Sequence, residues 1–401
     1  MVINTSKLLS AWSSALSLLI RPVLAVSLLC CYWPISATTD VKILLDSSKI
    51  KSPIWRFSSP ADLWVGVPKQ PATRQRIAKE QPLTVTIKYQ SIYLNEQKWP
   101  HATLYILPQA PHCVNLDGQA FHGLFLITKH QSEFVLINYV DLEDYICSVL
   151  KTECWPTWPD EVYRVCAVAS RSYIIAKILE NRHSKQPLPY HASSTNKHQT
   201  YSGKHDDPRL RRIVDETRGL IIGHNQQPVL AMFDCCCGGI IPAHMSEVNF
   251  TAAPYLKRTY PCHYCRSWKH HEWQAKISLK KFKTVLKTEL PKIKQIDHIT
   301  IKKDRAGLVK QVLIKDGKTM HKFKGKLLYR LFKEIKSFCF TLTKSGADIV
   351  VAGKGYGHHL GVCQWGAKQM VTEGWHYRQI LKFYFPNTHF MRLKASASEI
   401  S

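Results

Sequence analysis

The strongest constraint on the fold is a helical pattern between Pro159 and Arg182 that is apolar on opposite sides of the helix. One stripe consists of Val162, Val165, Ala169, Tyr173 and Ala176. The opposite side is covered by Val168, Ile174, Ile175 and Ile178. Because a helix that is apolar on both sides lies in the interior of a protein, the sequence predicts a central buried helix. The chain has 401 residues, 45% of them hydrophobic, which is enough to surround that helix with a core.

A second helix is predicted directly upstream, over residues 142–153. Asp141 is a typical N-cap residue, and apolar residues follow it at helical spacing. Pro156 and Pro159 cannot continue a helix, so this one ends near Glu153. Pro159 then begins the central helix, since proline is favourable at a first helical position.

Short alternating apolar runs, typical of β-strands, occupy residues 41–140. Further strands are predicted at residues 220–222, 229–233, 298–302 and 312–315, with a hairpin turn at Asp316-Gly317. Short helices are predicted at residues 327–333, 367–373 and 377–384. We therefore expect the α+β class and a single large unit, either compact or bilobed, because no Pro/Gly/Ser-rich linker divides the chain.

The N-terminus has the pattern of an export signal. An apolar stretch over residues 8–35 is interrupted at Arg21-Pro22 and ends at Ser36-Ala37, a small-residue cleavage point. We predict a signal peptide over residues 1–37, with an uncleaved membrane anchor as the alternative. Either form places the protein in the periplasm or on the outer face of the cytoplasmic membrane.

The net charge of +26 is concentrated in a Lys-rich segment, residues 266–345. One interpretation is a solvated lysine face, and the other is a long-range field that attracts a polyanion. No recognition helix, RNP-like strand or paired zinc-finger spacing accompanies the charge, so nucleic acid is not an expected partner.

Two ionisable residues on the predicted helices are candidates for chemistry. Glu153 continues the buried face of its helix, where burial and the negative helix end both favour the protonated carboxyl that a general acid needs. The alternative is a glutamate that turns to water at the helix end. Arg171 lies midway along the central helix, where an arginine requires a partner, and we expect that partner to be Glu153.

A cysteine pair, Cys262 and Cys265, has metal-ligand spacing, and Cys237 ends a run of three cysteines upstream. These three residues are candidate ligands of a structural zinc ion. One such pair is a weak signal, so a disulfide and free thiols are the alternatives.

Several motifs occur in an order that resembles the SpoIID/LytB family of cell-wall proteins. They include the run 138–145 leading to Glu153, Ala169-Ser170-Arg171-Ser172, and His198-Gln199-Thr200-Tyr201. Cys237-Gly238-Gly239, the glycine-rich loop 353–361 and Gln364-Trp365-Gly366-Ala367 follow in the same order. The resemblance covers about residues 41–390, comprising the β-rich part 41–140 and the Lys-rich segment 266–345, with residues 391–401 as a tail.

This resemblance implies a SpoIID-like fold with a substrate cleft and a peptidoglycan lytic transglycosylase, with Glu153 as the acid/base. The product would carry 1,6-anhydromuramic ends, and the substrate would be glycan strands stripped of peptide. It further implies substrate contacts by Arg171, Gln199, Tyr201, His358, Gln364 and Trp365. No cofactor is required for that reaction.

The family also leaves a second function open. Some relatives enhance cell-wall amidases, so the alternative is a non-catalytic glycan-binding protein with an amidase as partner. The chain departs from the family pattern at His359, which replaces a glycine. Some family members bind a metal near the position that corresponds to His198. In this chain only His191 and His198 could act as metal ligands in that region.

Overall fold

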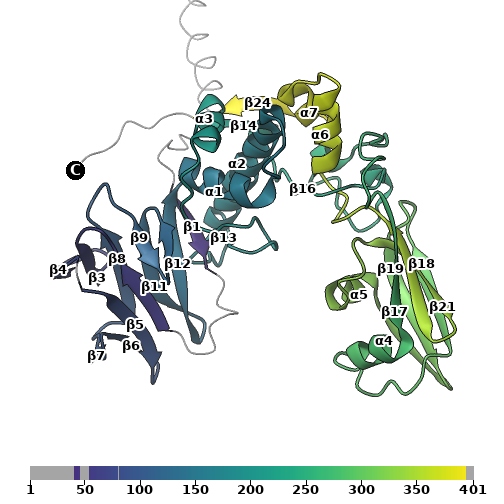
Figure 1. The fold of residues 1–401 in the computed structure, drawn as a ribbon, viewed down its shortest axis with the longest axis horizontal. Coiled ribbons are helices and arrows are strands. Elements are labelled where there is room, and N and C mark those ends of the chain that lie inside the picture. The colour runs from purple at the N-terminus through teal and green to yellow at the C-terminus, as the bar shows by residue number, and fades with distance from the viewer. Residues whose placement is uncertain (1–39, 46–53, 80, 394–401) are drawn as a thin grey trace, which may run out of the picture.

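The computed structural model describes residues 40–45, 54–79 and 81–393 (Figure 1). The predicted signal peptide lies outside these residues. Within them, no helix is both long and apolar enough to cross a membrane. Helices and strands are mixed along the chain in one large unit, which confirms the α+β prediction.

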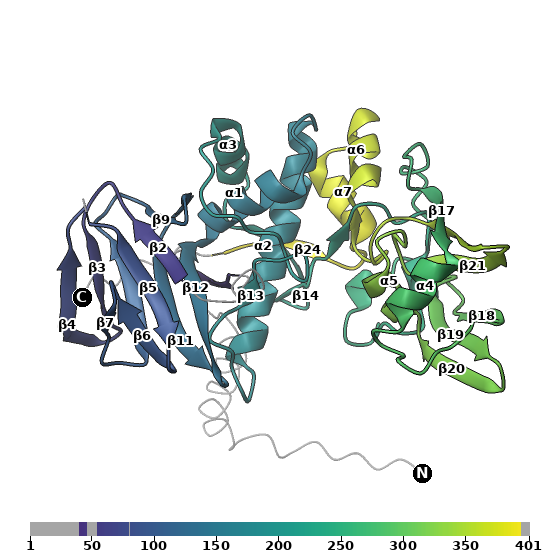
Figure 2. The ribbon, with the colours of Figure 1, turned by 60° about the horizontal axis from the view of Figure 1, so that its bottom comes forward.

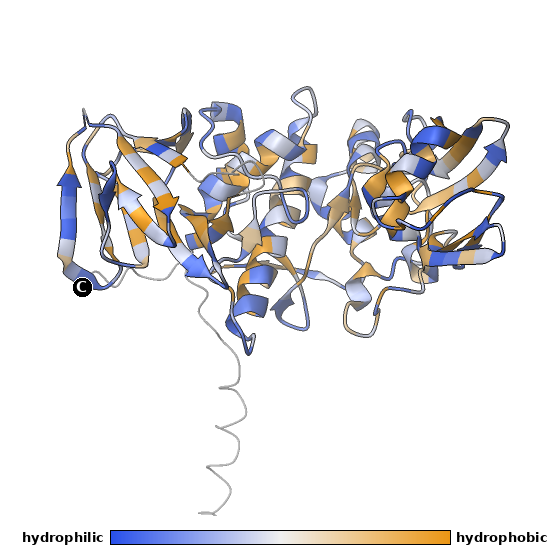
Figure 3. Cartoon of the chain, turned by 90° about the horizontal axis from the view of Figure 1, so that it is seen from below, coloured by the Kyte–Doolittle hydropathy of each residue, from blue (hydrophilic) through white to orange (hydrophobic). Residues whose placement is uncertain are grey.

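Two β-sheets form the N-terminal part, at one end of the molecule (Figure 2). The larger sheet has the order β13 (Ala192–Ser193), β1 (Asp40–Leu44), β12 (Glu133–Asp141), β11 (Leu124–His130), β8 (Thr103–Pro108), β3 (Leu63–Val67), β4 (Gln70–Ile77). The smaller has the order β10 (Gln119–Phe121), β9 (Val114–Leu116), β2 (Ile54–Ser58), β5 (Leu83–Lys88), β6 (Ser91–Leu94), β7 (Gln97–Lys98). Figure 3 shows hydrophobic and hydrophilic residues alternating along most of these strands, as expected when one face of a strand is buried, whereas the edge strand β4 is exposed over nearly all of its length.

The centre of the molecule is helical and surrounds the predicted buried helix. Its helices are α1 (Leu142–Glu153), α2 (Asp160–Arg182), α3 (Pro208–Glu216), α6 (Gln364–Thr372) and α7 (Tyr377–Tyr384). As predicted, Asp141 caps α1 by accepting hydrogen bonds from the backbone N–H groups of Glu143 and Asp144. Helix α2 is buried along most of its length, which confirms the prediction from its two apolar sides.

Short strands connect distant parts of the chain around α2. Strand β14 (Leu220–His224) lies between β15 (Gln227–Pro228) and the last strand, β24 (His389–Arg392). β16 (Phe233–Asp234) pairs in parallel with β23 (Val362–Cys363). The strand predicted at residues 229–233 is wrong over most of its length. Val229 and Ala231 are buried in the core of the helical region as part of a loop, so their apolar character reflects packing and not a ladder.

The Lys-rich segment folds around a core of its own at the other end of the molecule (Figure 2). One sheet consists of β17 (Glu272–Ser278), β22 (Asp348–Lys354) and β21 (Cys339–Ser345). A second consists of β18 (His298–Lys303), β19 (Val309–Asp316) and β20 (Thr319–Lys324), with the predicted hairpin turn at Gly317. The flanking helices are α4 (Leu279–Leu286) and α5 (Gly325–Leu331). The chain leaves the helical centre, builds this C-terminal unit, and returns to α6, α7 and β24.

Candidate active site

Glu153 is the last residue of α1, because the backbone becomes extended at Cys154. Its side chain is partly exposed, and its Oε1 accepts a hydrogen bond of 2.8 Å from the backbone N–H of Thr200. The side-chain amide of Gln364, at the start of α6, donates to the backbone carbonyl of Glu153 at 3.1 Å. Three segments far apart in sequence therefore meet at Glu153, one at its carboxyl group and one at its backbone carbonyl.

The segment that contains Thr200 is held by buried hydrogen bonds of its neighbours. Gln199 and Tyr201 are 1% and 5% exposed. The hydroxyl of Tyr145 donates to Gln199 Oε1 at 2.9 Å, and the hydroxyl of Tyr201 donates to Asn138 Oδ1 at 2.6 Å. Burial raises the pKa of both tyrosines, so both hydroxyls remain protonated donors. The structure therefore places Gln199 and Tyr201 behind Glu153, where their side chains fix the Thr200 backbone.

Aromatic side chains extend from Glu153 toward the C-terminal unit in a row that we call the aromatic row: Trp155, Trp365, Trp268 and Tyr356. Trp268 stacks between Trp365 and Tyr356, with ring centroids 5.1 and 6.2 Å away and planes 16° apart in both pairs. Trp155 contacts Trp365 edge-on at 6.3 Å and is 54% exposed. The buried ring of Trp158 supports Trp365 from another side. The exposed members of the row are Trp155, two residues after Glu153, and Tyr356, whereas Trp365 and Trp268 are partly buried.

Only Trp365 of this row was predicted from the sequence as a site residue; Trp155, Trp268 and Tyr356 were not. Trp155 lies two residues after Glu153, which was an available signal. Trp268 follows Cys265 by three residues, and no periodicity or motif distinguishes it.

The predicted pairing of Arg171 with Glu153 is wrong. Arg171 is fully buried, and its guanidinium binds the Glu143 carboxylate, with Nη2 to Oε2 at 2.7 Å and Nε to Oε1 at 3.1 Å. Glu143 lies ten residues before Glu153, or about 15 Å away along a helix of 1.5 Å rise per residue. The registry of α2 against α1 brings Arg171 to the first turn of α1 and not to its end.

Arg171 and Glu143 together fix the centre of the molecule. Arg171 Nη1 donates to the backbone carbonyl of Leu220 at 3.0 Å, and the backbone N–H of Gly219 donates to Glu143 Oε1 at 3.2 Å. The pair thus connects α1, α2 and the turn that enters β14. With 0% and 3% of their side chains exposed, neither residue can contact a polymer at the surface.

His358 is partly buried and lines a cavity of about 220 Å³ whose other walls include Met245, Val248 and Leu308. This cavity faces the C-terminal unit, so the predicted substrate contact of His358 stays a prediction. The adjacent His359 adopts a φ of 66°, the left-handed region that favours glycine. Its backbone N–H donates to Asp234 Oδ2 at 2.6 Å and its ring Nδ1 contacts the carbonyl of Cys237 at 2.9 Å, which holds it in that conformation.

The three predicted metal ligands come together in the structure. Cys237, Cys262 and Cys265 are buried, and a fourth cysteine, Cys363, joins them. Cys363 was not predicted as a ligand, because it is far from the others in the chain and immediately precedes Gln364.

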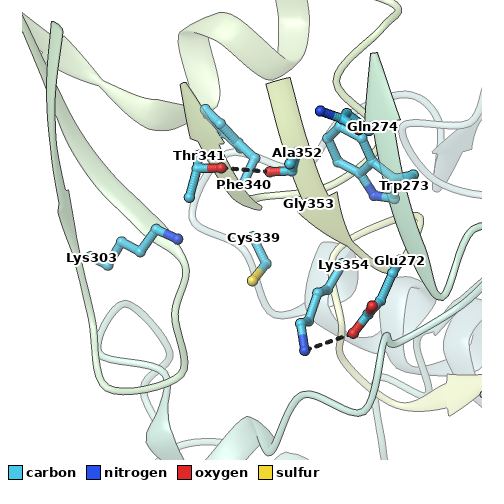
Figure 4. Close-up of a pocket in the computed structure, with 10 residues that line it drawn as sticks. All are labelled: Glu272, Trp273, Gln274, Lys303, Cys339, Phe340, Thr341, Ala352, Gly353 and Lys354. Atoms are coloured by element: carbon cyan, nitrogen blue, oxygen red, sulfur yellow. Dashed lines mark hydrogen bonds and ion pairs between the residues drawn. The ribbon is translucent and has the colours of Figure 1, made fainter. Parts of the chain in front are cut away.

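A groove of about 530 Å³ crosses the strands β17, β22 and β21 of the C-terminal unit (Figure 4). Figure 4 shows Lys303 across the groove from Trp273 and from the Glu272–Lys354 ion pair, which spans 3.0 Å. None of the predicted site residues lines this groove. The candidate active site is therefore defined by Glu153 and its neighbours in the helical centre.

Comparisons with known proteins place these features in a family. Residues 130–224 match the SpoIID family, described as stage II sporulation protein. This range includes α1, Glu153, Arg171 and the Gln199–Tyr201 segment. An uncharacterized protein of Brachyspira hyodysenteriae is 30% identical over 273 residues, which cover 67% of this chain and 72% of that protein.

Several relatives have functional names. Stage II sporulation protein D of Bacillus subtilis is 26% identical over 272 residues, covering 65% of this chain and 77% of the relative. The amidase enhancer of Bacillus subtilis is 45% identical over 53 residues, which are 13% of this chain and 8% of that protein. The ordered motifs, their coverage and the family match agree, and the chain belongs to the SpoIID family.

Proposed function

We propose that this protein is a lytic transglycosylase that cleaves peptide-stripped glycan strands of peptidoglycan, with Glu153 as the acid/base. Family membership and the local match to an amidase enhancer support a role connected with the cell wall. The observation that carries the finer proposal is the placement of Glu153 beside exposed aromatic rings. Among the described residues, its Oε2 has no hydrogen-bond or ion-pair partner and is available to a substrate.

The reaction needs one carboxyl group that acts twice. Glu153 first donates its proton to the glycosidic oxygen, and the bond from that oxygen to C1 of the muramic residue breaks. The resulting carboxylate then takes the proton from the 6-hydroxyl of the same muramic residue, whose oxygen forms the new bond to C1. The sugar supplies its own nucleophile, so no water is consumed and the 1,6-anhydro ring balances the atoms.

The surroundings of Glu153 suit both steps. The Thr200 N–H stabilises the carboxylate that forms after proton donation, because a hydrogen bond to the charged form favours it. Gln364 and Thr200 hold the backbone and one oxygen of Glu153, which leaves the other oxygen in a fixed direction. Such fixed geometry lowers the entropy lost when substrate and acid meet.

Purified peptide-stripped strands provide the test. We expect the protein to shorten them, as measured by size-exclusion chromatography of the glycan after incubation.

A second candidate function, non-catalytic enhancement of an amidase, is favoured by the 45% identical segment shared with the amidase enhancer. If the protein binds the strands but never shortens them, the lytic transglycosylase proposal is rejected and the amidase-enhancer function is supported. Both functions require a location outside the cytoplasm, as the leader predicts.

Trp155→Ala is expected to weaken binding to glycan strands. Sugar rings present apolar faces that pack on exposed aromatic rings, and Trp155 is 54% exposed in the aromatic row. An aromatic contact of about 0.5–1.5 kcal/mol corresponds to a dissociation constant raised roughly two- to tenfold, measurable by fluorescence titration. Tyr89, which is 92% exposed on the β5–β6 turn, provides the matched control. Equal losses in Trp155→Ala and Tyr89→Ala would exclude a specific role of the row.

The C-terminal unit is expected to attract anionic wall polymers. Its lysines are mostly exposed on neighbouring strands, as at Lys302, Lys315 and Lys322. Binding to isolated cell walls should fall as salt rises, because exposed charges are screened beyond roughly 8 Å at physiological ionic strength. Changing these three lysines to glutamate should weaken this binding and reduce its salt dependence. The same change at three exposed lysines near the N-terminal sheets should leave the salt dependence unchanged; these are Lys69, Lys79 and Lys98. Salt-independent binding of the wild-type protein would contradict the proposal.

A further inference from the structure

Four cysteine side chains from three separate segments converge in the core of the helical region. Cys237 follows β16, Cys262 and Cys265 lie in the loop after residue 256, and Cys363 ends β23. Their sulfur atoms all lie within 4.8 Å of one another, and each residue is at most 1% exposed. We call this group the cysteine cluster.

The spacing fits a metal ion and not a disulfide. Cys237 Sγ and Cys265 Sγ are 3.8 Å apart, whereas bonded sulfurs lie about 2.05 Å apart. Four thiolates around zinc at about 2.3 Å in tetrahedral geometry would lie about 3.8 Å from each other. The Cys237–Cys265 separation matches that value, and all four sulfur atoms of the cluster lie within 4.8 Å of one another, close enough to share one ion.

Hydrogen-bond donors surround the sulfurs in the way that metal-bound thiolates require. The backbone N–H groups of Cys237 and Gly366 both donate to Cys363 Sγ, at 3.2 and 3.3 Å. The Tyr384 hydroxyl lies 3.2 Å from Cys262 Sγ, and Nδ1 of His271 lies 3.4 Å from Cys265 Sγ. Cys363 is also the N-cap of α6, where the helix dipole favours a negative sulfur.

A buried cation lies on the side of Tyr384. Arg258 is 1% exposed, and its guanidinium lies 5.8 Å from the centre of the Tyr384 ring. Its hydrogen bonds go to the backbone carbonyls of Tyr260 and Ile240, and among the described residues no carboxylate pairs with it. Four thiolates and one divalent zinc ion have a net charge of −2, and the single positive charge of Arg258 near Tyr384 offsets half of it.

We propose that Cys237, Cys262, Cys265 and Cys363 bind one structural zinc ion that holds the aromatic row in place beside Glu153. Binding releases the thiol protons and converts the four sulfurs to thiolate ligands. All four positions are filled by protein, so this site has no open position for catalysis.

The consequence for the active site follows from the chain connections. Cys265 precedes Trp268 by three residues, and Cys363 immediately precedes Gln364 and Trp365. The ion would therefore anchor both partners of the Trp268–Trp365 stack and the glutamine that binds the Glu153 backbone. This consequence for glycan binding rests on the proposed function, whereas the presence of the metal does not.

Metal analysis of protein purified without chelators tests the proposal directly. We expect one zinc ion per chain by inductively coupled plasma mass spectrometry, falling to less than half in Cys363→Ser and Cys262→Ser. Cys235→Ser is the matched control, because Cys235 belongs to the same run of cysteines but not to the cluster, and it should retain zinc. Cys236→Ser should retain it too, although Cys236 lies close to Cys265 and His271.

A second measurement does not depend on how well the variants fold. Wild-type protein whose zinc is replaced by cobalt should show the visible absorption bands of a tetrahedral cobalt thiolate centre. Three results would each overturn the proposal. They are wild-type protein without zinc, iron bound in place of zinc, and a disulfide within the cluster, which peptide mapping without reduction would detect. If the protein contains zinc but leaves glycan intact, the proposed zinc site stands and the proposed enzymatic activity is rejected. Failure of the zinc proposal and failure of the proposed function can therefore be told apart.

Discussion

Glu153→Gln is expected to lower the rate of glycan-strand cleavage by about a hundred- to ten-thousand-fold, the usual contribution of a general acid–base group. Glutamine can still accept the hydrogen bond from the Thr200 N–H, so the local structure should persist. It cannot donate a proton to the glycosidic oxygen or take one from the 6-hydroxyl. Initial rates of anhydromuramic release, followed by chromatography of the products, give the comparison.

Two controls separate loss of chemistry from loss of binding. The variant should bind peptide-stripped strands as tightly as the wild type, because the aromatic row is unchanged. Glu161→Gln replaces a glutamate on the neighbouring helix, where the carboxylate pairs with Arg164, and should cleave at close to the wild-type rate. Activity retained in Glu153→Gln within a factor of a few would remove Glu153 from the mechanism.

Arg171→Met is expected to destabilise the protein by about 3–5 kcal/mol, the cost typical of leaving one member of a buried ion pair without its partner. Glu143 would remain 3% exposed, with its carboxylate facing only the Gly219 N–H. Urea denaturation followed by tryptophan fluorescence measures the change, since several tryptophans lie in the helical centre. Arg330→Ala breaks an exposed pair with Glu289 and should change stability by at most about 1 kcal/mol.

The double variant Arg171→Met/Glu143→Leu distinguishes a structural role from a substrate contact. Replacing both charges by apolar groups of similar size should restore much of the lost stability. Glycan cleavage should recover with it, because neither side chain reaches the surface. A stable double variant that binds no glycan would instead return Arg171 to the substrate site.

Local signals predicted the helical centre well. The Asp141 cap, the prolines after Glu153 and the two apolar sides of the next helix each depend on nearby residues, and α1 and α2 begin and end as expected. The helix predicted at residues 377–384 coincides with α7 for the same reason. These features are set by periodicity and capping, which a sequence contains directly.

What the sequence did not predict depends on tertiary registry. Arg171 could have met either glutamate of α1, and only the packing of α2 against α1 selects Glu143. Cys363 joins the cysteine cluster through the β16–β23 pairing, which places Asp234 beside it. The loop at residues 229–232 resembles a strand because it is apolar, yet its burial comes from the surrounding core. In each case the missing information is a contact between distant segments.

The most direct test of the central claim is mass spectrometry of the ends that the wild-type protein creates in peptide-stripped glycan strands. If Glu153 donates its proton and then activates the 6-hydroxyl, every new end on the muramic side is a 1,6-anhydro sugar, and Glu153→Gln produces none above background. Reducing muramic ends would show that water is the nucleophile and that the protein is a hydrolase, which would contradict the transglycosylase account.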